Sequence, residues 1–537
     1  MTSKHRTVPN LPAPALATMI IKYLIAPLAF VLFFISSIFA MPQGAGKSEV
    51  NDFIKFYPKL EKKAQKLEAI LALEKVSTYE AAEALVPILK DEDGDIRNTI
   101  IKVLAANNSP ESVNYLIGIL KKKDNAIRPG VIQVLGIGKR AEARLEIEKL
   151  IKDTDWLTRT RSAEALGRIG APESAELLLP LTKDAESNVR VAAIDGIAAI
   201  GQEASAPALI AALTDKNWRV RASAIAGLGR VRSKDALAPL VGIVESDEGR
   251  LVEDASKTLK LLTGRDFGKD YNSWKRWYDA YGKDPNYKLP TVQELAAIDA
   301  KREAAPRAGE TGVVKERKIA EFLGVETPSK KILFIIDCSG SMEDLVVEKE
   351  RYRDRKYPGF RKMDIVKEEL ARTIERLDTK TDFAIATFAT KVKPWKRGEL
   401  VNANSINRAA AVDFARSLEP IGGASKQDLA SAGFGGAAAL GEGKTNTHGA
   451  LMHGLGNPKR GVIEKDYTTQ IDTIFFLSDG KPSTGDLVDT DDILAAVYEA
   501  NSQKKITIHV LGIGDFEKGF MKQLAEHNGG VFVDLGK

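Results

Sequence analysis

The fold of the C-terminal part of the chain is decided by KILFIIDCSGSM, which runs from Lys331 to Met342. It begins with a continuous apolar run that ends in an acidic residue, Asp337. Such a run is typical of a strand buried on both faces of a parallel sheet. Similar runs follow at DFAIATFA, TIFFLSDG, ITIHVLGIG and VFVDL, and helical patterns separate them, at residues 363–377, 405–418, 491–501 and 516–527. This alternation predicts an α/β doubly wound (Rossmann-like) domain over residues 331–537.

Polar residues follow these strands, at the edge where ligands collect in open parallel sheets. Asp337, Ser339 and Ser341 form D-x-S-x-S after the first strand. Thr445 lies in the loop GKTNTHGAL, and Asp479 ends the strand IFFLSDG. Carboxylates and hydroxyl groups are hard oxygen ligands that suit Mg²⁺, Ca²⁺ or Mn²⁺. Two carboxylates and three hydroxyl groups leave an octahedral shell incomplete, so water or an acidic side chain of a partner has to complete it.

This combination of motifs resembles the von Willebrand factor type A domain with its metal-ion-dependent adhesion site. The resemblance covers residues 331–537, and all three motif segments occur in the order of the family. It implies a protein-interaction domain that binds Mg²⁺, with Ca²⁺ or Mn²⁺ as alternatives, and a protein partner that presents an acidic residue to the ion. The ligands that it implies, direct or through water, are Asp337, Ser339, Ser341, Thr445 and Asp479, with Thr447 as the alternative to Thr445.

Cys338 and His448 offer a competing enzymatic interpretation, because a Cys/His pair can form a nucleophile. Cys338 alternates with the expected ligands, so its side chain is expected to point into the core. No third group presents itself to orient His448. Cys338 is the single cysteine of the chain, which excludes an intramolecular disulfide and a cysteine-based zinc site. We therefore expect no catalytic residues.

The N-terminal half repeats itself every 31 residues. Each unit reads as two short amphipathic helices, and neither can bury its apolar face without stacking on its neighbours. An acidic residue stands six positions before most of the repeated arginines. We expect the pairs to be structural, each arginine bonding an aspartate of its own or the adjacent turn; an anion-binding ladder is the alternative. The repeated residues are Arg97, Arg128, Arg159, Arg190 and Arg221, with Asp91, Asp153, Asp184 and Asp215.

This pattern resembles HEAT repeats, in particular the short bacterial type of bilin lyases, and predicts an all-α solenoid over residues 51–282. The aromatic residues Phe267, Trp274, Trp277 and Tyr278 are expected to cover its last helix face. Residues 283–330 contain four prolines and no strand pattern, so they are predicted to be a linker with one exposed helix. The resemblance also implies bilin-lyase-like enzyme activity as an alternative function, although the repeats contain no recognisable nucleophile or base.

An apolar run without charge, Tyr23 to Ala40, follows three basic residues: Lys4, Arg6 and Lys22. This asymmetry holds the N-terminus in the cytoplasm. Residues 1–40 are predicted to be a signal peptide or a signal anchor, with Met1 or Met19 as the start. An extracytoplasmic location of residues 41–537 follows (periplasmic, secreted or anchored to the membrane by residues 23–40), in a bacterial-type protein.

The composition fits a multidomain globular protein of 537 residues, 44% of them hydrophobic. A net charge of +5 over this length gives no case for a nucleic-acid partner. The predicted function is metal-dependent protein–protein interaction, with the solenoid as a scaffold. The alternative is an assembly factor for an energy-driven complex, as in chelatase-type A domains that work with a ring ATPase; a cytoplasmic position of residue 537 would favour it.

Overall fold

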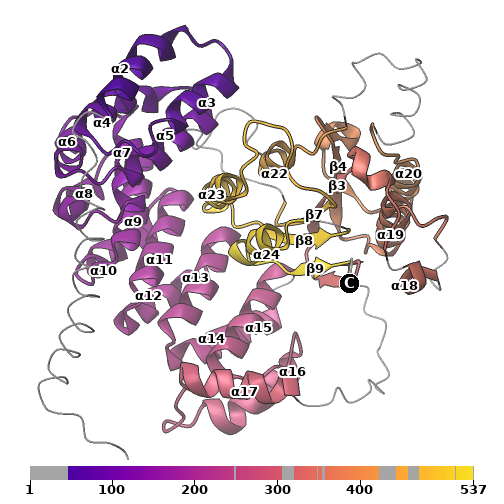
Figure 1. Cartoon of the computed structure of the whole chain (residues 1–537). Coiled ribbons are helices and arrows are strands. Elements are labelled where there is room, and N and C mark those ends of the chain that lie inside the picture. Colours follow the sequence, from indigo (N-terminus) through magenta and orange to yellow (C-terminus); the bar gives the residue numbers. More distant parts are fainter. Residues whose placement is uncertain are drawn as a thin grey trace, which may run out of the picture.

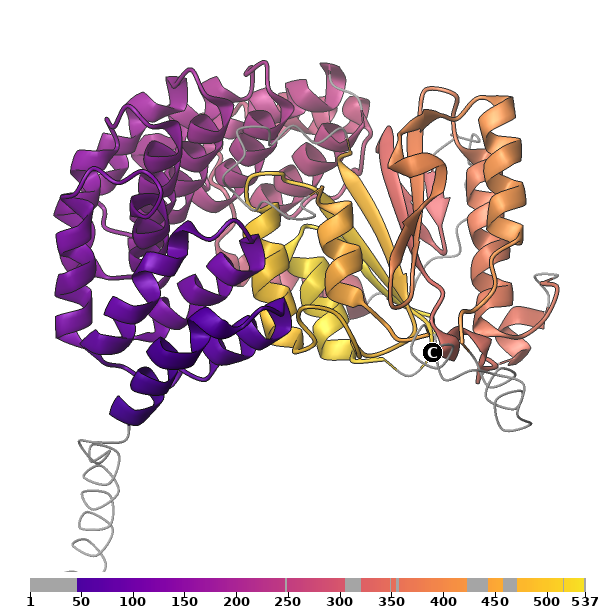
Figure 2. The ribbon, with the colours of Figure 1, turned by 90° about the horizontal axis from the view of Figure 1, so that it is seen from above.

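The computed structural model describes residues 46–246, 249–304, 320–347, 349–353, 357–422, 443–456, 471–514 and 516–535. A curved array of helices wraps around one side of an α/β domain (Figures 1 and 2). The predicted signal or anchor at residues 1–40 lies outside the described residues. Across the ranges just given, no helix is both long enough and apolar enough to cross a membrane.

The array runs from α2 (Lys47–Phe56) to α16 (Tyr271–Trp277). After α3 (Lys63–Leu71), an inner row of helices faces the α/β domain and an outer row covers it from behind (Figure 1). Both rows contribute to one continuous apolar core, as stacked repeats require. The inner helices are α5 (Gly94–Ala106), α7 (Arg128–Ile137), α9 (Trp156–Ile169), α11 (Ser187–Ile200), α13 (Trp218–Val231) and α15 (Arg250–Thr263). The outer ones are α4 (Tyr79–Leu85), α6 (Pro110–Leu120), α8 (Arg144–Leu150), α10 (Ser174–Leu178), α12 (Ala206–Ala212) and α14 (Leu237–Ser246).

Three of the repeated arginines, Arg128, Arg159 and Arg190, link one unit of the array to the next. Arg159 donates hydrogen bonds of 2.8 and 3.0 Å to the carboxylate of Asp184, 25 residues later, and one of 2.8 Å to the carbonyl oxygen of Asp153. Arg190 repeats this pattern with the carboxylate of Asp215 and the carbonyl oxygen of Asp184. The structural interpretation of the repeat is confirmed, because these guanidinium groups are engaged within the array rather than offered to an anion.

Aromatic side chains close the array at its C-terminal end, as predicted. Trp274 is fully buried, and its ring stands nearly perpendicular to those of Phe267 and Trp277, with centroids 4.9 and 6.1 Å apart. Tyr278 packs against the same core. Together they cover an apolar helix face that would otherwise be exposed.

A seven-stranded sheet forms the centre of the α/β domain, in the order β5-β4-β3-β7-β8-β9, and β6 pairs with β4. Strands β3, β4, β7, β8 and β9 are parallel to one another, whereas β5 and β6 run antiparallel to β4. Helices cover both faces, which confirms the doubly wound prediction. The strands are β3 (Lys331–Asp337), β4 (Asp382–Phe388), β5 (Val392–Pro394), β6 (Val401–Asn402), β7 (Thr473–Ser478), β8 (Thr507–Gly512) and β9 (Phe532–Asp534). Helices α19 (Lys362–Arg376) and α20 (Ser405–Arg416) pack on one face, and α22 (Thr447–Gly454), α23 (Thr490–Asn501) and α24 (Lys518–His527) on the other.

The segment between the two bodies differs in part from the prediction. Helix α17 (Val292–Ala304) is present as expected, but strands β1 (Ala320–Phe322) and β2 (Val325–Thr327) form a hairpin. The prediction that residues 283–330 hold no strand is therefore wrong for this segment. Phe322 is fully buried against Phe334 of β3, so the hairpin is part of the α/β core. Two three-residue strands are too short for a periodic signal, which is why the pattern missed them.

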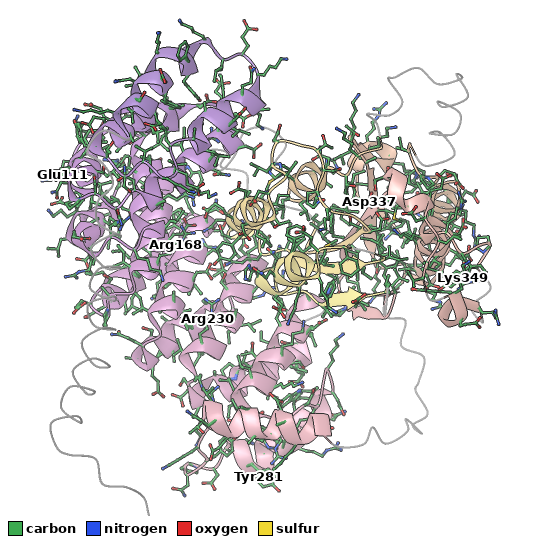
Figure 3. All side chains as sticks on the ribbon, in the orientation of Figure 1. Glu111, Arg168, Arg230, Tyr281, Asp337 and Lys349 are labelled. Atoms are coloured by element: carbon green, nitrogen blue, oxygen red, sulfur yellow. The ribbon has the colours of Figure 1, made fainter. Side chains whose placement is uncertain are left out.

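Charged side chains hold the α/β domain against the concave side of the array. Glu499 of α23 accepts hydrogen bonds from Arg161 (2.7 Å), Arg168 (2.9 Å) and Gln133 (2.5 Å). Burial alone would raise the pKa of Glu499, but the guanidinium groups of Arg168 and Arg161 hold it below its usual value. Arg168 points from the array toward the α/β domain (Figure 3). Further pairs along the same face are Lys102–Asp492, Arg219–Gln503 and Lys505–Asp195.

Candidate metal centre

The parallel register of the sheet brings the predicted ligands together. Ile336 of β3 lies beside Leu477 of β7, so the residues that follow these strands emerge next to each other. Ser341 donates a hydrogen bond of 2.8 Å to the carboxylate of Asp479, and its hydroxyl oxygen lies 3.2 Å from that of Ser339. Figure 3 labels Asp337 at this edge of the domain.

Asp337 is held by two short contacts and is completely buried. One carboxylate oxygen accepts the backbone N–H of Ser339 at 2.8 Å, and the other accepts the hydroxyl group of Ser478 at 2.6 Å. Burial raises the pKa of Asp337, and the neighbouring carboxylate of Asp479 raises it further. A buried carboxylate pair of this kind favours a cation beside it.

Thr445 joins the cluster from a third loop. A β-carbon added to Gly480 would lie 3.3 Å from the hydroxyl oxygen of Thr445 and 3.6 Å from that of Ser341, so the two hydroxyl groups flank the same glycine. The backbone N–H of Thr445 donates to the hydroxyl oxygen of Ser483 at 2.9 Å. The alternative residue, Thr447, begins α22 and has a buried hydroxyl group without a hydrogen-bond partner.

Lys362 is a member of the site that the sequence did not reveal. Its ammonium group lies 2.8 Å from one carboxylate oxygen of Asp479 and 3.4 Å from Asp344, and the lysine is largely buried. Burial raises the pKa of Asp479, and Lys362 acts against that rise. Lys362 follows a charge-rich stretch in which no single lysine stands out. Its contact with Asp479 forms only because α19 packs beside the end of β7.

These residues fit a hard divalent cation chemically. Carboxylate oxygens of Asp337 and Asp479 and hydroxyl oxygens of Ser339, Ser341 and Thr445 come from three loops to one edge of the sheet. Such donors are the ligands that Mg²⁺ and Mn²⁺ prefer. The second carboxylate oxygen of Asp479 already has a cationic partner, Lys362, which a metal ion would have to share or displace.

The burial of Cys338 argues against a catalytic thiol at this position. The side chain is buried, and burial together with the charge of Asp337 raises the pKa of the thiol to about 12. The thiolate is the nucleophilic form, so at neutral pH this cysteine is inert. His448, the suggested base, lies in α22 beside Asp95 of the helical array.

The two halves of the chain match known families. Residues 59–136, 119–187 and 175–260 match HEAT repeats, and residues 331–535 match the von Willebrand factor type A domain. The chain carries HEAT repeats followed by a type A domain. Type A domains commonly bind a divalent cation, and both families typically serve protein interactions rather than catalysis.

Curated relatives match somewhat more than a third of the chain. Inter-alpha-trypsin inhibitor heavy chain H1 of Mesocricetus auratus is 27% identical over 205 residues, which is 38% of this chain. Heavy chain H4 of Homo sapiens is 27% identical over 214 residues, which is 39% of this chain. The chain spans 18% of the length of each of these relatives.

Solved structures are similar to parts of this chain at a low level. The complex of CpcE and CpcF of phycocyanin lyase from Nostoc is 20% identical, with a TM-score of 0.27, and the match covers 45% of this chain and 96% of that one. Proximal thread matrix protein 1 from the mussel byssus, with a zinc-occupied MIDAS motif, is 14% identical with a TM-score of 0.24 and covers 38% of this chain and 44% of that one. Likenesses at this level say nothing about what this chain binds.

Proposed function

We propose that the type A domain binds Mg²⁺ or Mn²⁺ through Asp337, Ser339, Ser341, Thr445 and Asp479, and uses the ion to bind an acidic side chain of a protein partner. The observation that carries the proposal is the convergence of these carboxylates and hydroxyl groups from three loops at the carboxyl edge of the sheet. Mg²⁺ is the expected ion, with Mn²⁺ or Ca²⁺ as substitutes.

The charges of the site permit an anionic ligand once a divalent ion is bound. The ion and the ammonium group of Lys362 together balance the carboxylates of Asp337, Asp479 and Asp344, of which Asp344 is largely exposed and contributes least. The three hydroxyl groups add no charge. A carboxylate from a partner would therefore complete the coordination and form a charge-assisted contact, whereas a neutral side chain would not.

The HEAT array supports the site mechanically in this proposal. Its inner helices bind α23 through Glu499, and Lys63 of α3, at the N-terminal end of the array, binds Asp486 in the loop after β7. That loop begins with Asp479, so the array fixes the segment that carries one expected ligand. The array acts as a scaffold that orients the type A domain, and the partner is bound at the carboxyl edge of the sheet.

The carboxylate requirement is testable before the partner is known. Mn²⁺ bound to the full-length chain should enhance the relaxation of water protons, because the open position holds water. Short peptides that contain aspartate should reduce this enhancement, and matched peptides with asparagine should leave it unchanged. Cys338→Ala is the control variant and should behave as wild type. Equal effects of the two peptides would contradict the proposal.

Export of the protein is part of the same proposal, and it is supported by the basic residues that precede the apolar run Tyr23 to Ala40. Reporter enzymes fused after Lys47 test it in a bacterial host. A reporter that works only in the periplasm should be active, and one that works only in the cytoplasm should be silent. The opposite pattern would favour the alternative, an assembly factor for a cytoplasmic ATPase.

A further inference from the structure

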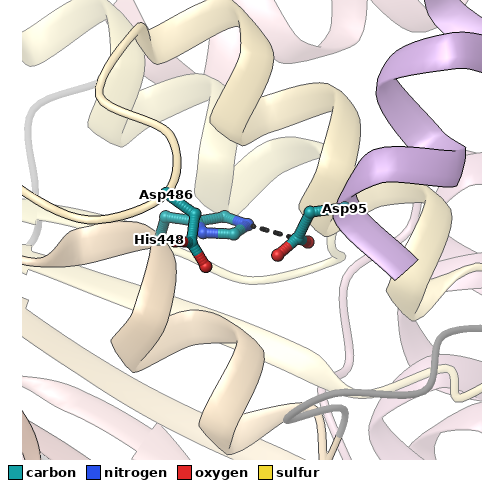
Figure 4. A group of neighbouring side chains, drawn as sticks. All are labelled: Asp95, His448 and Asp486. Carbon is teal, nitrogen blue, oxygen red and sulfur yellow. Dashed lines mark ion pairs between the residues drawn. The ribbon is translucent and has the colours of Figure 1, made fainter. Parts of the chain in front are cut away.

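A second group of potential metal ligands lies between the HEAT array and the type A domain. Asp95 comes from the first turn of α5, His448 from the first turn of α22, and Asp486 from the loop between β7 and α23. One ligand atom from each lies within 4.8 Å of the others (Figure 4). His448 Nε2 is 3.6 Å from a carboxylate oxygen of Asp95.

His448 provides the observation that points to a ligand. The side chain is 2% exposed, and neither ring nitrogen has a hydrogen-bond partner. Buried polar groups are nearly always paired, because an unpaired one costs roughly 1–3 kcal/mol. The Nε2 side of the ring faces Asp95 at a distance too long for a hydrogen bond (Figure 4). A neutral imidazole with a free nitrogen between two carboxylates is a typical metal ligand.

Lys63 is the resident counter-ion of this cluster. Its ammonium group bonds Asp95, lies 2.7 Å from Asp486 and lies 3.1 Å from Asp93. One ammonium group therefore serves three carboxylates and leaves an excess of negative charge. If a divalent ion takes Asp95 and Asp486, Lys63 keeps Asp93 as its partner. The lysine competes with a metal ion at this position without blocking it.

We propose that Asp95, His448 and Asp486 form a binding site for a transition-metal ion of the Zn²⁺ type, which links the HEAT array to the type A domain. Imidazole together with carboxylate suits Zn²⁺ rather than Mg²⁺ or Ca²⁺. Bonds of about 2.0–2.2 Å to a tetrahedral ion place ligand atoms about 3.4 Å apart. The 3.6 Å between His448 and Asp95 already matches this spacing, and the ligand atom of Asp486 lies within 4.8 Å of both.

The position of this site gives the ion a structural role next to the candidate Mg²⁺ site. His448 follows Thr445 by three positions, and Asp486 follows Asp479 by seven. Both loops are thus tied to α5 of the array when the ion is bound. The inference is independent of the proposed function, because its ligands are a different set of residues.

Zinc titration of the full-length chain by calorimetry tests the proposal, with Co²⁺ absorption as a second measure of ligation by histidine. Wild type and Asp337→Ala should bind one ion equally at this site. His448→Phe, which fills the same space without a donor, should weaken binding by on the order of 100-fold or more, at least the loss that follows removal of an outer-shell partner. His453→Gln, on the same helix, is the matched control and should bind as wild type.

Two further variants test the same site if His448→Phe folds poorly. Asp95→Asn should weaken Zn²⁺ binding while it preserves the shape of the side chain, and Lys63→Met should strengthen it because the competing charge is removed. Zn²⁺ should also raise the Tm of wild type but not of Asp95→Asn. Equal Zn²⁺ binding by wild type, His448→Phe and Asp95→Asn would overturn the proposal. So would unchanged or weaker binding by Lys63→Met.

Discussion

At the scale of single residues, Lys362 is the competitor of the proposed metal ion. Its ammonium group pairs with Asp479 at 2.8 Å, and a divalent ion would have to share that carboxylate. Lys362→Met should therefore increase the affinity for Mg²⁺ and lower stability in its absence, because Asp479 loses its buried partner. Isothermal calorimetry and thermal unfolding measure both effects. Lys367→Met, on the same helix but paired with Glu419, is the control and should leave Mg²⁺ affinity unchanged.

His509 should make folding stability depend on pH. Burial, assisted by the charge of Lys257, lowers the pKa of His509 from 6.5 to about 4. The unfolded chain takes up its proton first, so stability is present above pH 6.5 and falls as pH decreases toward 4, by about 3 kcal/mol at most. His509→Gln should flatten this part of the stability curve in urea unfolding experiments. The exposed His527→Gln is the control, and an equally steep curve in both variants would contradict the assignment.

Four of the five expected ligands lie at strand ends, which is why the sequence places them together, whereas Thr445 lies in the loop before α22 and was expected from the family resemblance. Apolar runs place β3 and β7 in a parallel sheet, and the carboxyl ends of such strands share one edge. Lys362, Ser478 and the Asp95–His448–Asp486 cluster were not predictable in this way. Each depends on which surfaces pack together over long sequence separations, and a single lysine or aspartate in a charged stretch carries no signal of its partner.

At the scale of elements, the Arg/Asp bonds make the array a chain of linked helix pairs. Arg159→Met should destabilise the protein by roughly 2 kcal/mol or more, since Asp184 and the carbonyl group of Asp153 lose a largely buried donor. Lys149→Met, which removes an exposed contact to Glu146, should cost less than about 0.5 kcal/mol. Chemical unfolding monitored by helix content compares the two. Equal losses would show that the repeated arginines do not link the units.

Helices and strands followed their periodic patterns closely in most of the chain. The run KILFIID is strand β3 in full, and the helix expected at residues 405–418 is α20, Ser405–Arg416. The hairpin of β1 and β2 was missed because its strands are three residues each. Glycines within the inner helices are a partial sequence signal of tight packing between these helices. A β-carbon on Gly167 would lie 2.5 Å from the Cα atom of Gly196, so only glycine fits there.

At the scale of the whole molecule, the contact between array and type A domain is the feature that the sequence did not reveal. Glu499 and its arginine partners look like ordinary surface charges in the sequence, yet Arg161 and Glu499 are buried where the bodies meet. The predicted linker at residues 283–330 gave no indication of this contact. The structure instead presents one assembly in which the concave side of the array is occupied by its own C-terminal domain (Figure 2).

Glu499→Gln should therefore weaken the coupling between the two bodies. Removal of the charge leaves Arg168 without the carboxylate of Glu499 and leaves Arg161 with Glu164 alone, a loss of up to roughly 3–5 kcal/mol for a buried pair. Differential scanning calorimetry should show one unfolding transition in wild type separating into two in the variant. Glu526→Gln, at an exposed pair with Lys522, should keep the wild-type profile. A single unchanged transition in Glu499→Gln would mean that the interface does not couple the bodies.

The most direct test of the proposed metal-dependent interaction is Mg²⁺ binding to the full-length chain by calorimetry. Wild type, Cys338→Ala and His448→Phe should each bind one Mg²⁺ with similar affinity, because Cys338 and His448 are not ligands of this site. Asp337→Ala should lose the binding, because it removes one of the two buried carboxylates. Equal Mg²⁺ binding by wild type and Asp337→Ala would contradict the account.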